Sequence, residues 1–216
     1  IMTAIVTCGE TRQSLSAVRA LGRAHIPVAV GAARRPNLSM WSRYASSTFI
    51  LEDESLNAQK FAKSLAEEMR ARYAICALVS TDDALWALSR FRELLPIGAR
   101  KLLPPHYSVV RSLDHEALHH FAKSLGITCA DLIRVPEHAS ADEVLALIIP
   151  LRFPLLIRPT TPWVEREDGS RRLNHRLVAH SKEHVLSMLK DLSLGFLVSA
   201  YTTMKAVSYF GVAEKG

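Results

Sequence analysis

In the first half of the chain, short apolar runs alternate with segments whose apolar residues recur at helical spacing. Apolar stripes at helical spacing predict helices around Leu15–Leu21, at 57–72 and from Leu85 to Phe91. Short apolar runs predict strands at residues 2–7, 26–31, 48–51, 74–79 and 100–103. Strands and helices that alternate through short connections are typical of an α/β protein. We therefore predict a Rossmann-like domain with a parallel sheet at residues 1–105.

The second half of the chain has a different order of elements, which predicts an α+β domain at residues 106–216. Ser140 and Glu143 have the spacing of a capping box at the start of a helix. Ser181 is the expected cap of a later helix. Strands are predicted at 132–135, 155–157, 177–179, 196–201 and 207–212, with a helix over 108–126 and an arginine-rich polar loop over 160–176.

Composition places the chain among ordinary globular proteins. Of its 216 residues, 49% are hydrophobic and 22% are charged. No apolar run approaches the roughly 20 residues that span a bilayer, and the N-terminus is too short and uncharged for a signal peptide. The cysteines are odd in number and scattered, at Cys8, Cys76 and Cys129. A disulfide framework is therefore not expected, and we predict a cytoplasmic protein without a membrane partner.

The net charge of +6 is spread along the chain. Aromatic and basic residues do not interleave and no nucleic-acid motif occurs, so nucleic acid is not the expected partner. Scattered positive charge also suits a protein that handles phosphates. The first loop contains one glycine, Gly9, and lacks both a GxGxxG pattern and a Walker A lysine.

A polar segment, Ser80-Thr81-Asp82-Asp83, follows one of the predicted strands. Strand ends in α/β proteins line ligand crevices, and hydroxyls or carboxylates there also cap helices. We expect Asp82 to cap the next helix. The alternative is that Gly9, Thr81 and Asp82 line a substrate crevice.

The segment His115-Glu116-Ala117-Leu118-His119 has the HExxH pattern on a predicted helix. In zinc hydrolases two such histidines bind the metal and the glutamate is the general base. The chain contains nine histidines, and a chance match is expected at about the few-per-cent level, so the motif is uncommon but not compelling. His138 and His175 are only loose candidates for a third ligand. A zinc hydrolase is thus the weakest alternative, and we expect no metal ligands in this chain.

The segment Phe153-Pro154-Leu155-Leu156-Ile157-Arg158-Pro159 predicts a short buried strand between prolines. A charge at Arg158 is costly to bury unless an anion meets it. The simpler interpretation is that its long side chain reaches solvent past the end of the strand.

The order of several motifs resembles the ATP-grasp superfamily across the whole chain. These motifs are Ser112-Leu113-Asp114-His115 at a helix start, Leu125-Gly126-Ile127-Thr128, the Phe153–Pro159 strand and Phe196-Leu197-Val198-Ser199-Ala200-Tyr201. The resemblance is closest to the carboxylate–amine ligase and carbamoyl-phosphate-synthase-like branch, in which arginine can replace the strand lysine. Ser42-Arg43-Tyr44 and Ser80–Asp83 are similar to the pre-ATP-grasp domain of that branch.

The resemblance implies an enzyme that uses ATP and Mg²⁺ to activate a small carboxylate as an acyl phosphate, which an amine then attacks. It implies a phosphate contact at Arg158, with His115 or Arg111 as a second cation. Ser199, Ala200, Tyr201 and Thr202 would form the adenine hinge. The 160–176 loop, with Gly169-Ser170, would lie over the triphosphate, and a homodimer is a further implication.

Some positions depart from the family pattern. His115 occupies the place of a lysine or arginine, Ser199-Ala200 replaces an acidic hinge residue, and the 160–176 loop has a single glycine. The family's magnesium ligands would lie beyond Gly216. We therefore expect an N-terminal fragment of an ATP-dependent ligase that is inactive alone. The alternative is a non-catalytic nucleotide-binding or scaffold relative.

Overall fold

The computed structural model describes residues 3–100, 103–165, 170–173, 176–189 and 195–201. The chain forms two compact units. The first comprises residues 1–118 and 161–174, and the second comprises residues 119–160 and 175–216.

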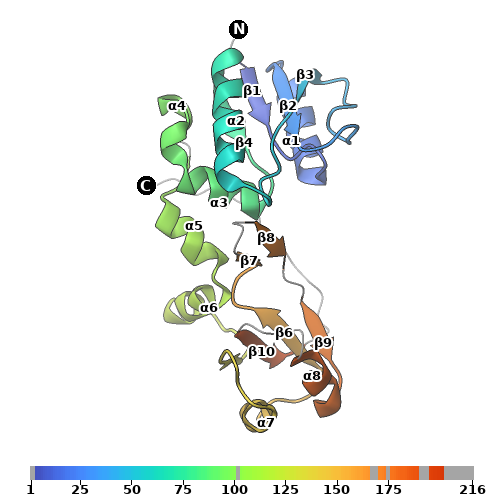
Figure 1. Cartoon of the computed structure of the whole chain (residues 1–216), viewed down its shortest axis with the longest axis vertical. Helices are drawn as coiled ribbons and strands as arrows, with labels where there is room; N and C mark the ends of the chain where they lie inside the picture. Colours follow the sequence, from blue (N-terminus) through green and yellow to red (C-terminus); the bar gives the residue numbers. More distant parts are fainter. Residues whose placement is uncertain (1–2, 101–102, 166–169, 174–175, 190–194, 202–216) are drawn as a thin grey trace. The chain divides into compact units, whose positions relative to one another are not determined.

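The first unit is built on a four-stranded sheet in the order β3-β2-β1-β4 (Figure 1). All its strand pairs are parallel, as the alternation of strands and helices predicts. The strands are β1 (Thr3–Val6), β2 (Val28–Ala32), β3 (Ala45–Ile50) and β4 (Ala74–Leu78). The chain moves outward from β1 to β3 and then returns to the other side of β1, so the order reverses between β1 and β4.

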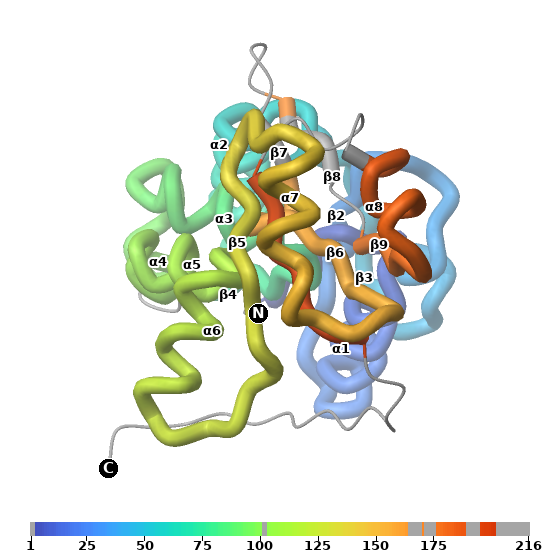
Figure 2. The backbone as a smooth tube through the Cα atoms, turned by 90° about the horizontal axis from the view of Figure 1, so that it is seen from below, coloured from blue at the N-terminus to red at the C-terminus, as the bar shows by residue number. Residues whose placement is uncertain are grey.

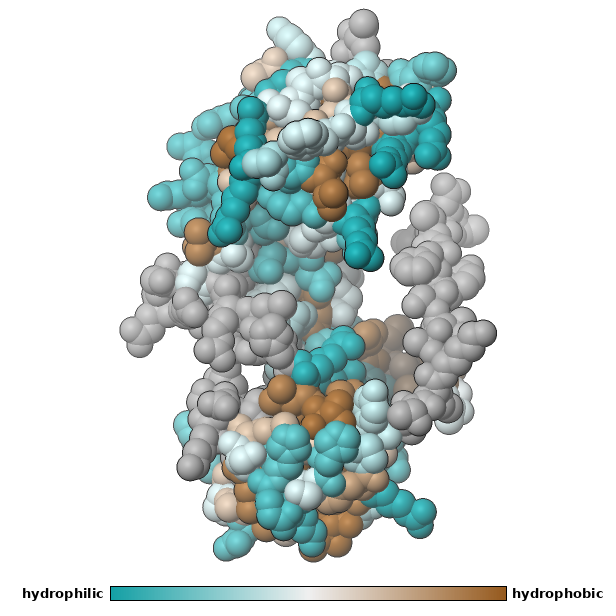
Figure 3. Space-filling view, turned by 90° about the vertical axis from the view of Figure 1, so that its right-hand side faces the viewer, coloured by the Kyte–Doolittle hydropathy of each residue, from teal (hydrophilic) through white to brown (hydrophobic). Residues whose placement is uncertain are grey.

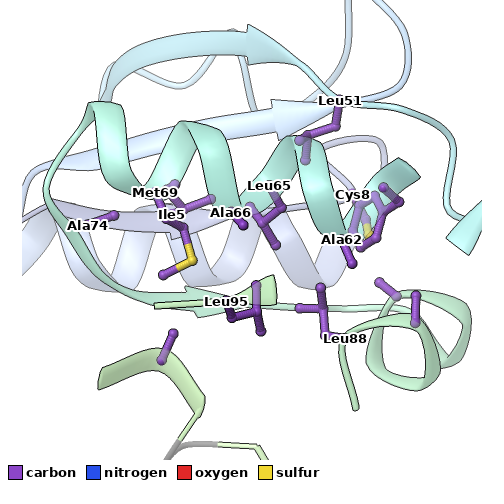
Figure 4. Close-up of a cluster of buried hydrophobic side chains, with 14 of the residues drawn as sticks. Ile5, Cys8, Leu51, Ala62, Leu65, Ala66, Met69, Ala74, Leu88 and Leu95 are labelled. Carbon is purple, nitrogen blue, oxygen red and sulfur yellow. The ribbon is translucent and has the colours of Figure 1, made fainter. Parts of the chain in front are cut away.

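Helices cover both faces of this sheet. Val6, Val28 and Val30 pack with Val18 of α1 (Arg12–Arg23). Ile5 and Ala29 point to the opposite face, because successive strand residues alternate. There they pack against α2 (Ala58–Ala71) and α3 (Asp82–Arg90). Figure 4 shows this second cluster, in which Leu65, Ala66 and Met69 of α2 lie over Ile5. Burial on both faces explains why β1 and β2 are continuous apolar runs.

The strand predicted at 100–103 is not formed by its described residues. Arg100 is the last residue of a short helix, α4 (Ile97–Arg100). Its guanidinium donates from Nε to Leu95 O at 2.7 Å and from Nη1 to Glu93 Oε2 at 2.6 Å. A 3₁₀ turn, η1 (Arg92–Leu94), precedes α4. Pro96 O accepts from the backbone N of both Ala99 and Arg100, which favours the helical turn over an extended chain.

The single helix predicted over 108–126 is two helices, α5 (His106–Leu113) and α6 (His115–Ser124). Asp114 separates them with an extended backbone, at φ −81° and ψ 107°. Its Oδ1 accepts from the backbone N of Glu116 and Ala117, each at 2.9 Å. Aspartate thus caps α6 and interrupts a stripe of apolar residues that by itself reads as continuous.

The second unit has a four-stranded sheet in the order β5-β10-β6-β9 with antiparallel pairs. Its strands are β5 (Leu132–Val135), β6 (Leu155–Pro159), β9 (Leu177–Ala179) and β10 (Phe196–Ala200). Helices α7 (Ala141–Ile148) and α8 (Lys182–Leu189) contribute to one core against this sheet (Figure 2). The predicted capping box of Ser140 and Glu143 is confirmed, and Ser181 Oγ accepts from His184 N at 3.2 Å.

The 160–176 segment, predicted as a loop, contains a two-stranded hairpin of β7 (Trp163–Glu165) and β8 (Arg171–Leu173). Strands this short can form although half of their residues are charged, because pairing supplies their backbone hydrogen bonds. Gly169, His175 and the strand predicted at 207–212 lie outside the described residues.

The surface agrees with the composition. On the face drawn in Figure 3, hydrophilic side chains predominate and the hydrophobic ones form small patches. None of the helices in the described ranges is both long and apolar enough to cross a bilayer.

Candidate functional site

The carboxyl edge of the parallel sheet in the first unit gathers small polar side chains. Thr7, Cys8 and Gly9 follow β1, and Ser80 and Thr81 follow β4. These strands are the neighbours between which the strand order reverses. In open α/β sheets ligands bind in the crevice at such a reversal.

Three hydroxyl groups join α1 to β4 at this edge. Ser14 Oγ donates to Thr7 O at 2.6 Å. The Ser80 hydroxyl lies 2.8 Å from the hydroxyls of both Thr11 and Ser14, and Ser14 N donates to Thr11 Oγ1 at the start of the helix. This network positions the first loop, and it occupies hydroxyls that the sequence alone leaves available for a ligand.

Cys8, Glu54 and Thr81 form a second polar group at the same edge. Glu54 Oε1 accepts from Thr81 Oγ1 at 3.0 Å and from Cys8 Sγ at 3.3 Å. Burial, followed by the charge of Glu54, raises the pKa of the Cys8 thiol to about 12. Cys8 is thus a protonated donor rather than a nucleophile. Its backbone has a φ of 52°, an uncommon conformation for a residue other than glycine.

Glu54 is the residue of this edge that the sequence analysis missed. It follows β3, and it meets residues 46 and 27 positions away in the chain. No spacing rule connects it with Cys8 or Thr81, since only the parallel pairing of the strands brings them together. An oriented carboxylate at a strand-order reversal suits a ligand that presents hydrogen-bond donors, such as an amine.

The three residues predicted to line this crevice differ in their surroundings. Gly9 is buried, and a Cβ there would lie 2.7 Å from Asn37 Oδ1, so the loop needs glycine for close packing. Thr81 is the N-cap of α3, since Ala84 N donates to its Oγ1 at 3.2 Å. Asp82 was the expected cap, which is wrong. It is the exposed first residue of the helix, where its charge still favours the helix N-terminus.

In the second unit, Arg158 lies on the face of the sheet that is turned away from α7 and α8. Leu155 and Ile157 are fully buried with the residues of those helices, and alternation places Leu156 and Arg158 on the other face. Across the sheet, Leu197 pairs with Arg158 on one side and with Arg134 on the other. The two arginines therefore flank a buried leucine.

Arg158 is half-buried, and its surroundings disfavour its positive charge. Its Nε is buried, and in the described part of the chain it has no hydrogen-bond partner. Burial, followed by repulsion from Arg176, lowers the pKa of the Arg158 guanidinium. A buried donor without a partner is costly, so this group is suited to an anionic ligand. Only Nε is buried without a partner among the described residues, and the end of this half-buried side chain can still reach solvent.

His119 lies beside these cations and is affected by their charge. Burial, followed by the charges of Lys123, His120 and Arg158, lowers the pKa of the His119 imidazole. Lys123 is partly neutralised by Asp131, at 3.6 Å. The sequence analysis named His119 only as part of HExxH and did not single out Arg176, because both come from elements remote from the Phe153–Pro159 strand.

The predicted hinge follows the central strand β10. Ser199 is buried and pairs with both neighbouring strands, β5 and β6. Tyr201 N donates to Pro154 O at 2.9 Å. Because backbone groups alternate sides along an antiparallel strand, those of Ala200 point away from β6, where the pairing with β5 ends at Ser199. Thr202 lies outside the described residues.

Arg111, His115 and the HExxH segment lie on α5 and α6. Arg111 is in the last turn of α5 and His115 is the first residue of α6. Both fall in the first unit, so their predicted contact with a phosphate stays a prediction. Among the described residues, no group of three or more His, Cys, Asp or Glu side chains could hold a metal ion. HExxH therefore has no third ligand in this part of the chain.

Comparisons with known proteins establish the fold. No protein-family model matches the sequence, and the search of curated proteins found no match. Among solved structures, an L-amino acid ligase from Bacillus licheniformis has a TM-score of 0.63 at 11% identity, over 93% of this chain and 44% of that one. A biotin carboxylase from Campylobacter jejuni has a TM-score of 0.60 at 12% identity, over 92% of this chain and 45% of that one.

A glycinamide-RNase-transformylase T from Mycobacterium tuberculosis is similar over 94% of this chain and 49% of its own, with a TM-score of 0.55 and 17% identity. The chain thus spans less than half the length of the structures that it matches. At these identities the similarity is one of fold.

Proposed function

Taking as our premise that the chain has the fold of the ATP-grasp superfamily, we propose that it contributes the nucleotide-binding part of an ATP-dependent carboxylate–amine ligase. The observation that supports this most directly is the buried, unpartnered Nε of Arg158 within the described residues. A phosphate oxygen would provide the missing acceptor. The planar guanidinium can also hold two such oxygens at once.

The surroundings of Arg158 suit a phosphate. Arg176 adds positive potential beside it. Phosphoryl transfer depends mainly on positioning and on neutralising the charge of the transferred group. Arg158 would orient the phosphate, and the backbone groups of Ala200, which point away from β6, would receive the adenine edge. His115 and Arg111 remain candidates for a second phosphate contact.

Following the family pattern, magnesium would be held by carboxylates outside this chain. At the carboxyl edge of the first unit, Glu54 and Thr81 are candidates for contact with the amine or carboxylate substrate, with Gly9 and Asp82 at the same strand ends. The cytoplasmic location and the homodimer also remain parts of this proposal.

Arg158→Gln tests the proposal in the protein that includes the natural continuation of the chain. Losing one charge-assisted contact costs ~1.5–3 kcal/mol, so ATP affinity measured by calorimetry should fall roughly 10- to 100-fold. Arg158→Lys should retain part of the affinity. Arg152→Gln is the matched control, since Arg152 is an exposed arginine of the same unit. Unchanged ATP affinity in Arg158→Gln, or no ATP binding by the parent protein, would refute the proposal.

A non-catalytic nucleotide-binding relative is the second candidate. His115 favours it, because an imidazole is a weaker cation at neutral pH than the lysine or arginine of the family pattern. ADP release in the presence of a panel of carboxylates and amines separates the two. A ligase releases ADP with at least one pair, whereas the alternative binds ATP without turnover.

A further inference from the structure

A hollow of about 460 Å³ opens on the first unit, between α1 and the segment that leads into β3. Its volume falls in the range of small-molecule sites, ~300–1,000 Å³. It lies away from the strand-order reversal and contains none of the residues assigned to the proposed function. Its walls are formed by Arg19, Arg23, Trp41, Ser42, Arg43 and Tyr44.

The hollow has a built floor. Tyr44 packs against the apolar cluster that includes Val18 of α1, and a Cβ at Gly22 would lie 2.4 Å from the Cβ of Tyr44 and 2.6 Å from its ring. Gly22 therefore lets the tyrosine lie directly on the helix backbone. Glycine inside a helix weakens it. The close contact between Tyr44 and α1 therefore comes with a less stable helix.

Backbone hydrogen bonds hold the opposite wall. Ser42 N donates to Ser39 O at 3.2 Å, and Ala45 N donates to Ser42 O at 2.9 Å. Ser39 N in turn donates to Gly9 O at 3.1 Å, which ties the segment to the end of β1. The side chains of Trp41 and Arg43 thus project from an ordered turn.

Three arginines concentrate positive charge in the hollow. Arg19 and Arg23 are one turn apart on α1, a spacing at which like charges repel. In the ranges that the structure describes, neither they nor Arg43 form an ion pair with a carboxylate. Arg43 Nη2 donates to the Tyr44 hydroxyl at 2.8 Å, and its guanidinium lies 4.9 Å from the centre of that ring.

The pKa of Tyr44 responds to the positive charge of these arginines. The hydrogen bond from Arg43, with smaller contributions from Arg23, lowers the pKa of the Tyr44 hydroxyl. The hollow thus favours negative charge at its centre.

Trp41 supplies a flat apolar surface beside these cations. Its side chain is 79% exposed. An indole among guanidinium groups is an effective platform for a planar ring, because tryptophan stacks on bases and arginine adds cation–π attraction to aromatic faces.

We propose that this hollow binds an anion that carries a flat ring, namely a nucleoside monophosphate. Trp41 stacks on the base, and Arg19, Arg23 and Arg43 receive the phosphate. Ser42 and Tyr44 offer hydroxyls to the sugar. The site is separate from the proposed ATP site and does not depend on it.

Calorimetric titration of the purified chain with adenosine 5′-monophosphate tests this site. Ribose 5-phosphate, which lacks the base, and adenosine, which lacks the phosphate, should each bind at least about tenfold more weakly, since each loses one set of contacts. Arg19→Gln and Trp41→Ala should each weaken the monophosphate about tenfold or more. Arg12→Gln, at an exposed position on the same helix outside the hollow, should leave binding unchanged.

Arg158→Gln distinguishes this site from the proposed ATP site. Monophosphate binding that survives Arg158→Gln and is lost in Arg19→Gln supports the inference, whatever happens to ATP. Loss in Arg158→Gln alone, or no binding to the parent chain at millimolar concentration, would overturn it. Analytical ultracentrifugation of the parent chain and the variants measures self-association. If Trp41→Ala and Arg19→Gln abolish self-association and the monophosphate does not change it, the hollow is an interface between copies of the chain and the inference fails.

Discussion

Replacing Gly22 by alanine should destabilise the protein, although alanine is the better helix former. In an exposed helix the change would stabilise by ~1 kcal/mol. Here the added Cβ would lie 2.4 Å from the Cβ of Tyr44 and 2.6 Å from Cγ and Cδ1 of its ring. These atoms lie near the backbone of Tyr44 and cannot swing away as a side-chain tip does.

Overpacking of this kind costs ~1–3 kcal/mol, and the short separation places Gly22→Ala near the upper end. Set against the propensity gain, the net loss is about 1–2 kcal/mol. For a chain of this size, this corresponds to a fall in Tm of roughly 2–8 °C. Urea unfolding followed by circular dichroism would give the free energy, and a thermal scan would give Tm.

Two further variants isolate the cause. Gly98 also lies in a helix, but a Cβ there would meet only Ile75 O, at 4.0 Å, so Gly98→Ala should be neutral or stabilise by up to ~1 kcal/mol. In a Tyr44→Gly background, Gly22→Ala should become stabilising, because all three close atoms are gone. Tyr44→Ala would not suffice, since the closest atom is the Cβ itself. Gly22→Ala that stabilises the parent chain, or that has the same sign in both backgrounds, would refute the reasoning.

Three other predictions follow from single sites. Cys8 should resist a thiol reagent at pH 8 in the folded chain, because its pKa is raised to about 12; labelling of Cys8 as fast as in urea, judged by peptide mass, would contradict this. Because the pKa of His119 is lowered below its ordinary value of 6.5, the unfolded chain binds its proton first as pH falls. Stability should therefore fall through pH 6.5 less steeply in His119→Gln than in the parent, and equal slopes in urea titrations would refute this. Ser140→Ala should cost about 1 kcal/mol through loss of the α7 cap, with Ser124→Ala, at the end of α6, as the control; an equal effect of the two would argue against the cap.

The elements that could be predicted are those whose signals lie in neighbouring residues of the sequence. The four strands of the first sheet and the capping box at Ser140 were predictable, because apolar runs and cap spacing are written in neighbouring residues. The break at Asp114 and the hairpin β7–β8 were not predicted. At Asp114, side-chain hydrogen bonds to the backbone interrupt an apolar stripe that predicts one helix. In the hairpin, pairing between β7 and β8 gives a strand conformation to a segment whose charged residues predict a loop.

The residues of the candidate sites also differ in whether the sequence alone could identify them. Arg158 could be singled out from the sequence, since its charge lies at the end of an apolar strand, where burial without an anion is costly. Glu54, His119 and Arg176 could not, because each comes from an element remote in sequence.

The sequence by itself determined the class of fold, the alternation of elements and the position of one strand cation. These depend on periodicity and composition, which act over a few residues. Only the tertiary structure decided that the Nε of Arg158 is buried without a partner among the described residues, that Glu54 meets Cys8, and that Gly22 lies under Tyr44. Such contacts join residues that are far apart in the chain, and their energy exists only once strand pairing and helix packing have brought the side chains together.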